Sequence, residues 1–159
     1  MKTFVKISAV LTWINLVIGS LGILLIVLAG AGSGTLINML PVLIIPSAIV
    51  LHSYAALQLR KSILHPEIPL SNQTPIGIRF IGYVSLFFAF MNLVSIISAI
   101  GHTKELAQQI KLPPEAANMD PIKLLNFAIV FSLLFSTSIL VNVIINFRLL
   151  RWYIIETSE

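Results

Sequence analysis

Cysteine is absent from the 159 residues of the chain. Without a thiol, the protein has no disulfide, no thiolate metal ligand, no cysteine nucleophile and no cysteine-based quinone redox chemistry. Charge is also scarce, because Asp, Glu, Lys and Arg make up only 10% of the residues, against about a quarter in a soluble domain. Hydrophobic residues reach 57%. The composition therefore predicts an integral membrane protein.

Acidic side chains are missing from every long apolar stretch. The only aspartate is Asp120, in a polar segment, so no Ser-His-Asp set is indicated. His65 and His102 stand in different polar segments without the ligand spacing of a metal site. We therefore expect no metal and no cofactor, and the sequence favours a protein without enzymatic activity.

Four apolar stretches dominate the chain, and they cover residues 7–29, 37–59, 80–100 and 124–147. Each is close to the roughly 20 residues that cross a hydrocarbon core of about 30 Å. We predict an all-α integral membrane protein of one domain, an antiparallel four-helix bundle threaded up-down-up-down. The predicted helices cover about 5–30, 37–61, 76–101 and 121–154. The first run is longer than the apolar part of a signal peptide, so we expect it to be retained as a helix.

Three connecting segments join the predicted helices. The first is a glycine-rich, uncharged turn at 31–38, and the second is a proline-punctuated loop at about 62–75. The third, at about 102–120, holds the stretch TKELAQQIKL. Its apolar residues recur at helical spacing, which predicts a short helix on the membrane surface, ending before the Pro113-Pro114 pair.

The cations are divided unequally between the two sides of this threading. One side holds Lys2, Lys6, Arg60, Lys61, Arg79, Arg148 and Arg151, and the other holds Lys104, Lys111 and Lys123. The positive-inside tendency then places both termini and the 62–75 loop in the cytoplasm. We expect a multi-pass protein of a bacterial plasma (inner) membrane. Because the cations flank apolar runs and form no continuous basic face, we expect no nucleic-acid partner.

Small and polar residues recur along one stripe of each predicted helix. The four stripes are Ser8, Thr12, Asn15, Gly19 and Gly22; Ala48, His52 and Ala55; Gly82, Ser85, Ala89 and Asn92; and Ser138, Asn142 and Asn146. Helices associate in lipid through close contacts at small residues and through interhelical hydrogen bonds. We therefore expect these stripes to face one another inside the bundle.

Four polar residues are predicted to form an intramembrane cluster. Counted at 1.5 Å per residue from the flanking cations, Asn15, His52 and Asn142 lie about 9 to 14 Å inside the membrane. Asn146 follows Asn142 by one helical turn. Lipid cannot satisfy their donors and acceptors, so a shared hydrogen-bonded cluster is expected. His52 is then either a neutral hydrogen-bonded imidazole that holds helices together, or a group that relays protons or binds a ligand.

The 62–75 loop and the start of the third helix are the predicted interaction segment. Three apolar side chains, Ile68, Leu70 and Ile76, are available there to a partner or to the membrane surface. The alternative is a loop packed on its own bundle, with Thr74 as the N-cap and Pro75 as the first residue of the helix.

Two classes of function remain open on these observations. The preferred one is a non-enzymatic accessory or interaction subunit, whose partners are the lipid bilayer and either another membrane protein or further copies of the chain. The alternative is a small oligomeric transporter or channel that uses the polar cluster. A water-filled cavity that reaches His52 favours transport, whereas a dry cluster favours association.

Overall fold

The structure is a computed structural model that describes residues 2–33, 36–110 and 118–157. These residues form helices and connecting turns, with no strand among them. The helices are α1 (Lys2–Ser33), α2 (Leu36–Leu64), α3 (Gln73–Gly101), α4 (Thr103–Gln109) and α5 (Pro121–Thr157). Part of the predicted glycine-rich turn (34–35), Lys111 and the Pro113-Pro114 pair lie outside the described residues.

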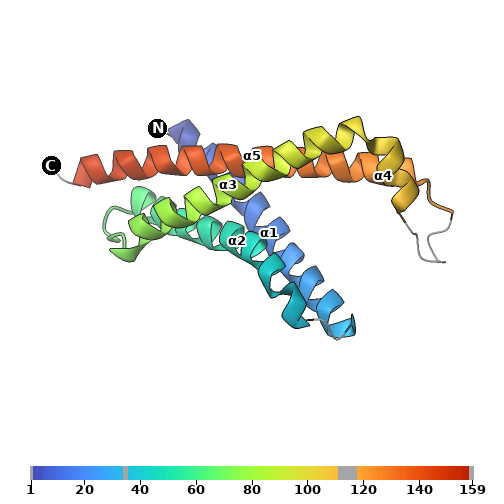
Figure 1. Ribbon diagram of the computed structural model, residues 1–159. Coiled ribbons are helices and arrows are strands. Elements are labelled where there is room, and N and C mark those ends of the chain that lie inside the picture. The colour runs from blue at the N-terminus through green and yellow to red at the C-terminus, as the bar shows by residue number, and fades with distance from the viewer. Residues whose placement is uncertain (1, 34–35, 111–117, 158–159) are drawn as a thin grey trace.

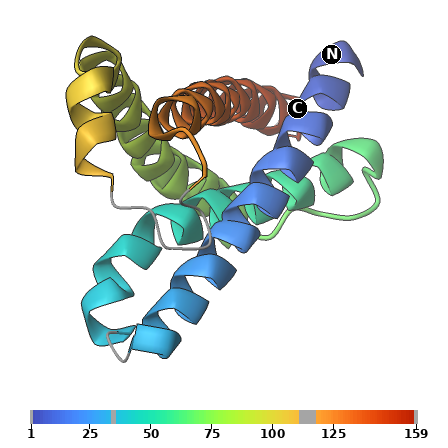
Figure 2. The same cartoon turned by 90° about the vertical axis from the view of Figure 1, so that its right-hand side faces the viewer.

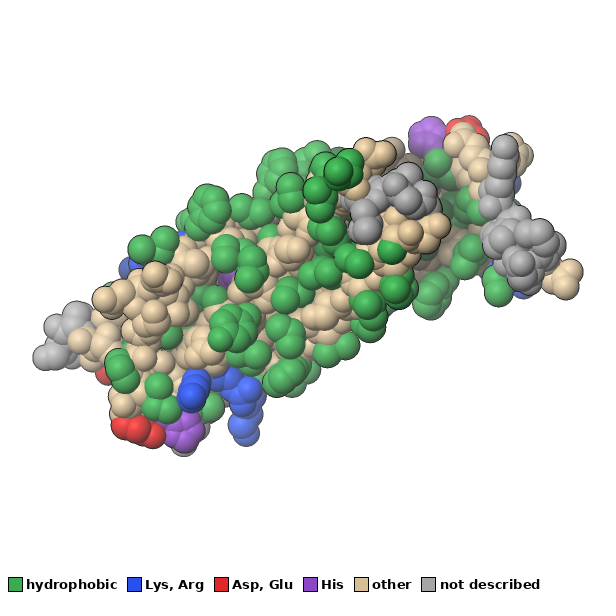
Figure 3. Space-filling model, turned by 90° about the horizontal axis from the view of Figure 1, so that it is seen from below, with side chains coloured by type: hydrophobic (Ala, Val, Ile, Leu, Met, Phe, Trp, Pro, Cys, Tyr) green, Lys and Arg blue, Asp and Glu red, His purple; other side chains and the backbone are tan. Residues whose placement is uncertain are grey.

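Four of the helices, α1, α2, α3 and α5, are long and apolar enough to cross a membrane. Even α2 and α3, with 29 residues each, are about 44 Å long at the usual helical rise. Figure 3 shows hydrophobic side chains along the length of the molecule and the charged side chains gathered toward its two ends. The predicted helical content and the four helices long enough to span a membrane are confirmed among the described residues, as a multi-pass membrane protein requires.

Local sequence explains where α3 and α5 begin. The Asp120 carboxylate accepts a hydrogen bond of 2.9 Å from the Ile122 backbone N–H, so it caps α5 with Pro121 as the first helical residue. At α3 the predicted Thr74 cap is wrong. The helix begins at Gln73 after Asn72, which makes no side-chain cap bond. Proline is tolerated within this first turn because its backbone N–H would have no partner inside the helix.

The four membrane helices pack closely over only half of their length. Figures 1 and 2 show α3 running beside α5, and the α1–α2 pair crossing these helices and diverging from them toward the end of α1 and the start of α2. We call the end with both termini and the 65–72 loop the closed half, and the end with the last residues of α1, the first residues of α2 and α4 the open half.

Burial follows the same division. In α1 the buried positions run from Val5 to Gly19, and beyond them only Gly30 is buried among the described residues. In α2 burial begins at Ala48. The physical reason lies in the stripes, because small and polar residues are replaced in the open half by Leu and Ile. These side chains gain no more from a neighbouring helix than from lipid. The structure thus differs there from the compact bundle that we expected.

Apolar side chains fill the closed half around the stripes. One cluster of buried residues consists of Val5, Leu59, Ile78, Ile145, Leu149 and Leu150, and a second consists of Ile49, Ala89, Ile139 and Val143. At the edge of this half the Arg148 guanidinium lies 5.0 Å from the centre of the Phe4 ring, a cation–π contact between α5 and α1.

Candidate functional site

The four polar residues predicted to lie in the membrane are all buried in the closed half. Exposed fractions are 1% for Asn15, 2% for His52, 0% for Asn142 and 1% for Asn146. They come from α1, α2 and α5. Buried polar groups at this depth are stable only when they bond one another, so their partners decide what the cluster does.

Hydrogen bonds between α1 and α5 form a regular series. Ser8 Oγ donates to Asn146 Oδ1 at 2.6 Å, and Thr12 Oγ1 donates to Asn142 Oδ1 at 3.0 Å. One turn further along, Ser138 Oγ donates to Asn15 Oδ1 at 2.9 Å. From one pair to the next, the residue number increases on α1 and decreases on α5, as is expected for two antiparallel helices. We call these three pairs the polar ladder.

Asn146 is the centre of the network. Besides accepting from Ser8, its side-chain amide donates to Asn142 Oδ1 at 3.2 Å and lies 3.4 Å from His52 Nε2. The structure thus brings together Asn142, Asn146 and His52 as the sequence suggested. Among the described residues, however, no hydrogen bond directly joins any two of Asn15, His52 and Asn142. The sequence did not identify Asn146 as the centre of the network, because membership of a stripe does not show which residue makes the most hydrogen bonds.

The imidazole of His52 is tightly enclosed. Its Nδ1 makes no hydrogen bond to any described residue, although the Ile78 backbone lies beside the ring. A Cβ atom placed on Gly82 would lie 3.2 Å from His52 Cε1 and 2.5 Å from Phe147 Cε1. Glycine is therefore needed at position 82 for α3 to approach the ring. His52 is 2% exposed, and no carboxylate is among its hydrogen-bond partners in the described part of the chain.

Metal binding finds no support in the described part of the chain, where no three His, Asp or Glu side chains gather. His65 and His102 instead each lie 3.1 Å from a nearby exposed glutamate, Glu67 and Glu105 respectively. No known protein family, curated protein or solved structure matches the chain. The function must therefore be argued from the geometry of the molecule itself.

The predicted interaction loop contacts the closed half through Leu70. Ile68 and Leu70 are half-buried, and Leu70 packs against the first apolar cluster. The Leu70 backbone N–H also donates to the Tyr153 hydroxyl at 3.3 Å. Ile76, in contrast, is 70% exposed. Apart from residues 68 and 70, residues 64–73 are exposed, so both readings of the loop stay open.

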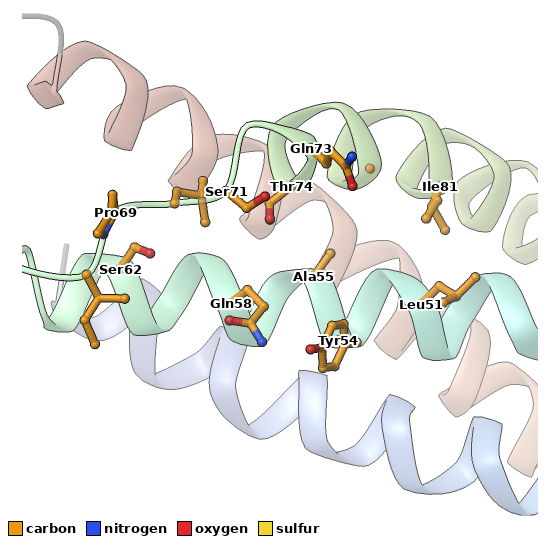
Figure 4. Close-up of a pocket in the computed structure, with 13 residues that line it drawn as sticks. Leu51, Tyr54, Ala55, Gln58, Ser62, Pro69, Ser71, Gln73, Thr74 and Ile81 are labelled. Carbon is orange, nitrogen blue, oxygen red and sulfur yellow. The ribbon is translucent and has the colours of Figure 1, made fainter.

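Sequence reasoning missed a cavity between α2, the loop and the start of α3. We call it the polar cavity because six of its 13 lining residues carry hydroxyl or amide groups, although the other seven are apolar residues and a glycine. It has a volume of about 490 Å³, and Figure 4 shows α2 along one side and the segment 69–74 with α3 along the other. A signal was present, because Tyr54, Gln58 and Ser62 recur at steps of four on a face of the second helix that does not carry His52.

Proposed function

We propose that the protein is a non-enzymatic accessory subunit that binds another transmembrane protein within the bilayer. We further propose an orientation in which both termini and the 65–72 loop face the cytoplasm. The cations Lys6, Arg60, Lys61, Arg79, Arg148 and Arg151 belong to that end, whereas Lys104 and Lys123 belong to the other. The positive-inside tendency supports this orientation.

The observation that carries the proposal is the contrast between the two halves. In the closed half the polar groups face inward and bond to each other across helices, which is what holds helices together in lipid. In the open half the α1–α2 pair stands apart from α3 and α5 (Figure 1). A subunit that binds a partner needs a rigid part and an unpacked helical face, and the two halves supply them.

A polar side chain marks the place where the two halves meet. At this fork α2, α3 and α5 diverge around a small cavity of about 200 Å³, lined by Ile45, Ile49, Phe88, Ala89, Asn92, Phe135, Ser136 and Ile139. Asn92 is exposed, and its amide donates to Ser136 Oγ at 2.6 Å. Its carbonyl oxygen has no partner among the described residues, and lipid offers no donor. A partner helix with a Ser, Thr, Asn or Gln side chain at this depth would supply one.

Transport by an oligomer is the second candidate. One observation favours it, because two buried nitrogens of the network, His52 Nδ1 and Asn142 Nδ2, have no hydrogen-bond partner among the described residues. Such atoms can bind a transient solute. The dryness of the cluster, in which His52 and Asn142 have at most 2% of their surface exposed, favours the accessory role.

Photocrosslinking in the native membrane tests the proposal. A photoreactive side chain at Ile45 faces the fork, and one at the exposed Ile144 on α5 faces lipid outside it. We expect a discrete protein adduct from position 45 only, and its loss in the Asn92→Leu variant. An adduct of twice the mass of the chain would identify the partner as a second copy. Adducts with lipid alone from both positions would refute the proposal.

A further inference from the structure

The polar cavity missed by the sequence continues into an apolar one. A second cavity, of about 590 Å³, lies between α2 and α3 on the side toward the start of α2. The two cavities share Leu51 and Ile81 in their linings. The second is lined otherwise by apolar residues and Ser47. The two cavities therefore adjoin along α2 and α3, and we call the pair the groove, with its polar end at the charged end of the molecule and its apolar end toward the middle of the helices.

The polar end carries hydrogen-bonding side chains that the protein does not use. Its hydroxyl and amide groups belong to Tyr54, Gln58, Ser62, Ser71, Gln73 and Thr74. None of these six side chains makes a hydrogen bond to another described residue. Ser62 is the most buried of the six, at 2% exposed, and it lines the cavity from α2 (Figure 4).

Charge near the polar end favours one kind of ligand. No Asp or Glu lines the cavity, so a ligand ammonium would find no carboxylate in its wall. Two cations, Arg60 and Lys61, directly precede Ser62 on α2, although neither lines the cavity, and Glu67 directly precedes the lining residue Ile68. The charges near the cavity are thus two cations against one carboxylate. Cationic residues at a membrane surface attract anionic lipid headgroups, and hydroxyl and amide donors are suited to phosphate oxygens.

We propose that this groove binds one anionic phospholipid with a hydroxyl-bearing headgroup, of the phosphatidylglycerol type. The phosphate and the headgroup hydroxyls lie among the six polar side chains, and one acyl chain lies along the apolar cavity past Leu51 and Ile81. The site is separate from the fork, so it stands whether or not a protein partner binds there.

Gly77 offers a way to block the site without disturbing the fold. It lines the polar cavity, and a Cβ atom placed on it would meet nothing within 4 Å. Gly77→Leu therefore fills the groove, and leucine is the better helix former at this position of α3. Gly32→Leu is the matched control. A Cβ atom on Gly32 would also meet nothing within 4 Å, but Gly32 lies near the end of α1 and lines neither cavity.

The experiment is native mass spectrometry of the purified chain with phosphatidylglycerol or phosphatidylcholine at equal concentration. We expect one phosphatidylglycerol per chain, favoured about tenfold over phosphatidylcholine, and about a tenfold loss in Gly77→Leu but not in Gly32→Leu. The double variant Gln58→Leu with Ser62→Ala should remove the headgroup preference without filling the groove. If the unfolding temperature of Gly77→Leu shows that this variant does not fold, the double variant still tests the proposal.

Three outcomes would overturn the proposal. One is equal binding of the two lipids by the wild-type chain. Another is an unchanged lipid preference in a folded Gly77→Leu variant and in the double variant. The third is a co-purifying protein that excludes lipid from the groove and is itself lost in Gly77→Leu.

Discussion

Thr12→Val tests the polar ladder with a change of one atom. The substitution keeps the shape of the side chain and removes the hydroxyl that donates to Asn142 Oδ1 at 3.0 Å. Hydrogen bonds between membrane helices contribute on average about 0.6 kcal/mol, with a maximum of about 1.7. Thr12 is 1% exposed, and its loss leaves a buried acceptor with one donor fewer, so we expect a decrease of about 1 kcal/mol in the free energy of unfolding.

The chain contains a matched control for this change. Thr137 is exposed, and its hydroxyl bonds only the Leu133 carbonyl of its own helix at 2.8 Å. Thr137→Val should therefore leave the free energy of unfolding within about 0.5 kcal/mol of the wild-type value. Both variants can be measured by equilibrium unfolding in mixed micelles, where a difference of this size is resolved.

Asn146→Leu extends the test to the centre of the network. This side chain accepts from Ser8, donates to Asn142 and lies against His52. Losing all three contacts should cost about 2 kcal/mol at the average value per bond. In a double-mutant cycle with Ser8→Ala, the effects should be less than additive because the two residues share one bond. Equal destabilisation by Thr12→Val and Thr137→Val, or full additivity in the cycle, would refute the reasoning.

Three further predictions follow from other contacts. Gly82→Ala should destabilise by about 1 to 3 kcal/mol, because the new Cβ meets an aromatic ring of α5 at 2.5 Å, whereas Gly101→Ala, with nothing within 4 Å, should be neutral on the same unfolding assay. In whole cells an impermeant thiol reagent should label Gln108→Cys and spare Ser71→Cys, and the reverse would invert the orientation. Tyr153→Phe removes the acceptor of a loop N–H, so limited proteolysis should cut the 65–72 loop faster than in wild type; an unchanged rate would show that this bond does not hold the loop.

The sequence was sufficient for the elements and for most of the buried stripe positions, although Asn92 of the third stripe is exposed. Four long apolar runs predict four helices because only a helix satisfies its own backbone in lipid. The positions of the stripes predict burial because Thr12, Asn15 and Asn142 have nowhere else to bond. These inferences depend only on the spacing of residues along one helix, and that spacing can be read directly from a single sequence.

Pairing between helices could not be predicted to the same degree. Whether Asn142 bonds Thr12 or His52 depends on the axial shift and crossing of two helices, and several shifts satisfy the same stripes. The divergence of the α1–α2 pair in the open half has the same origin. Leu and Ile faces specify no neighbour in lipid, so nothing in residues 20–29 indicates how far α1 departs from α5.

The polar cavity was missed for a different reason. Tyr54, Gln58 and Ser62 form a clear polar face of the second helix, but the cavity exists only because the loop and α3 close over it. A polar stripe on one helix predicts that this side of the helix faces other polar groups. It does not specify whether that is another helix, as for the polar ladder, or a space for a ligand.

The most direct test of the accessory role is proton flux in liposomes that contain the purified protein, measured for wild type and His52→Gln. The closed half buries His52 beside the Asn146 amide, and the accessory role requires that the imidazole only holds helices together. We expect no proton flux above that of protein-free liposomes from either protein, with both correctly folded. A flux in wild type that His52→Gln abolishes would contradict the account and establish the protein as a transporter.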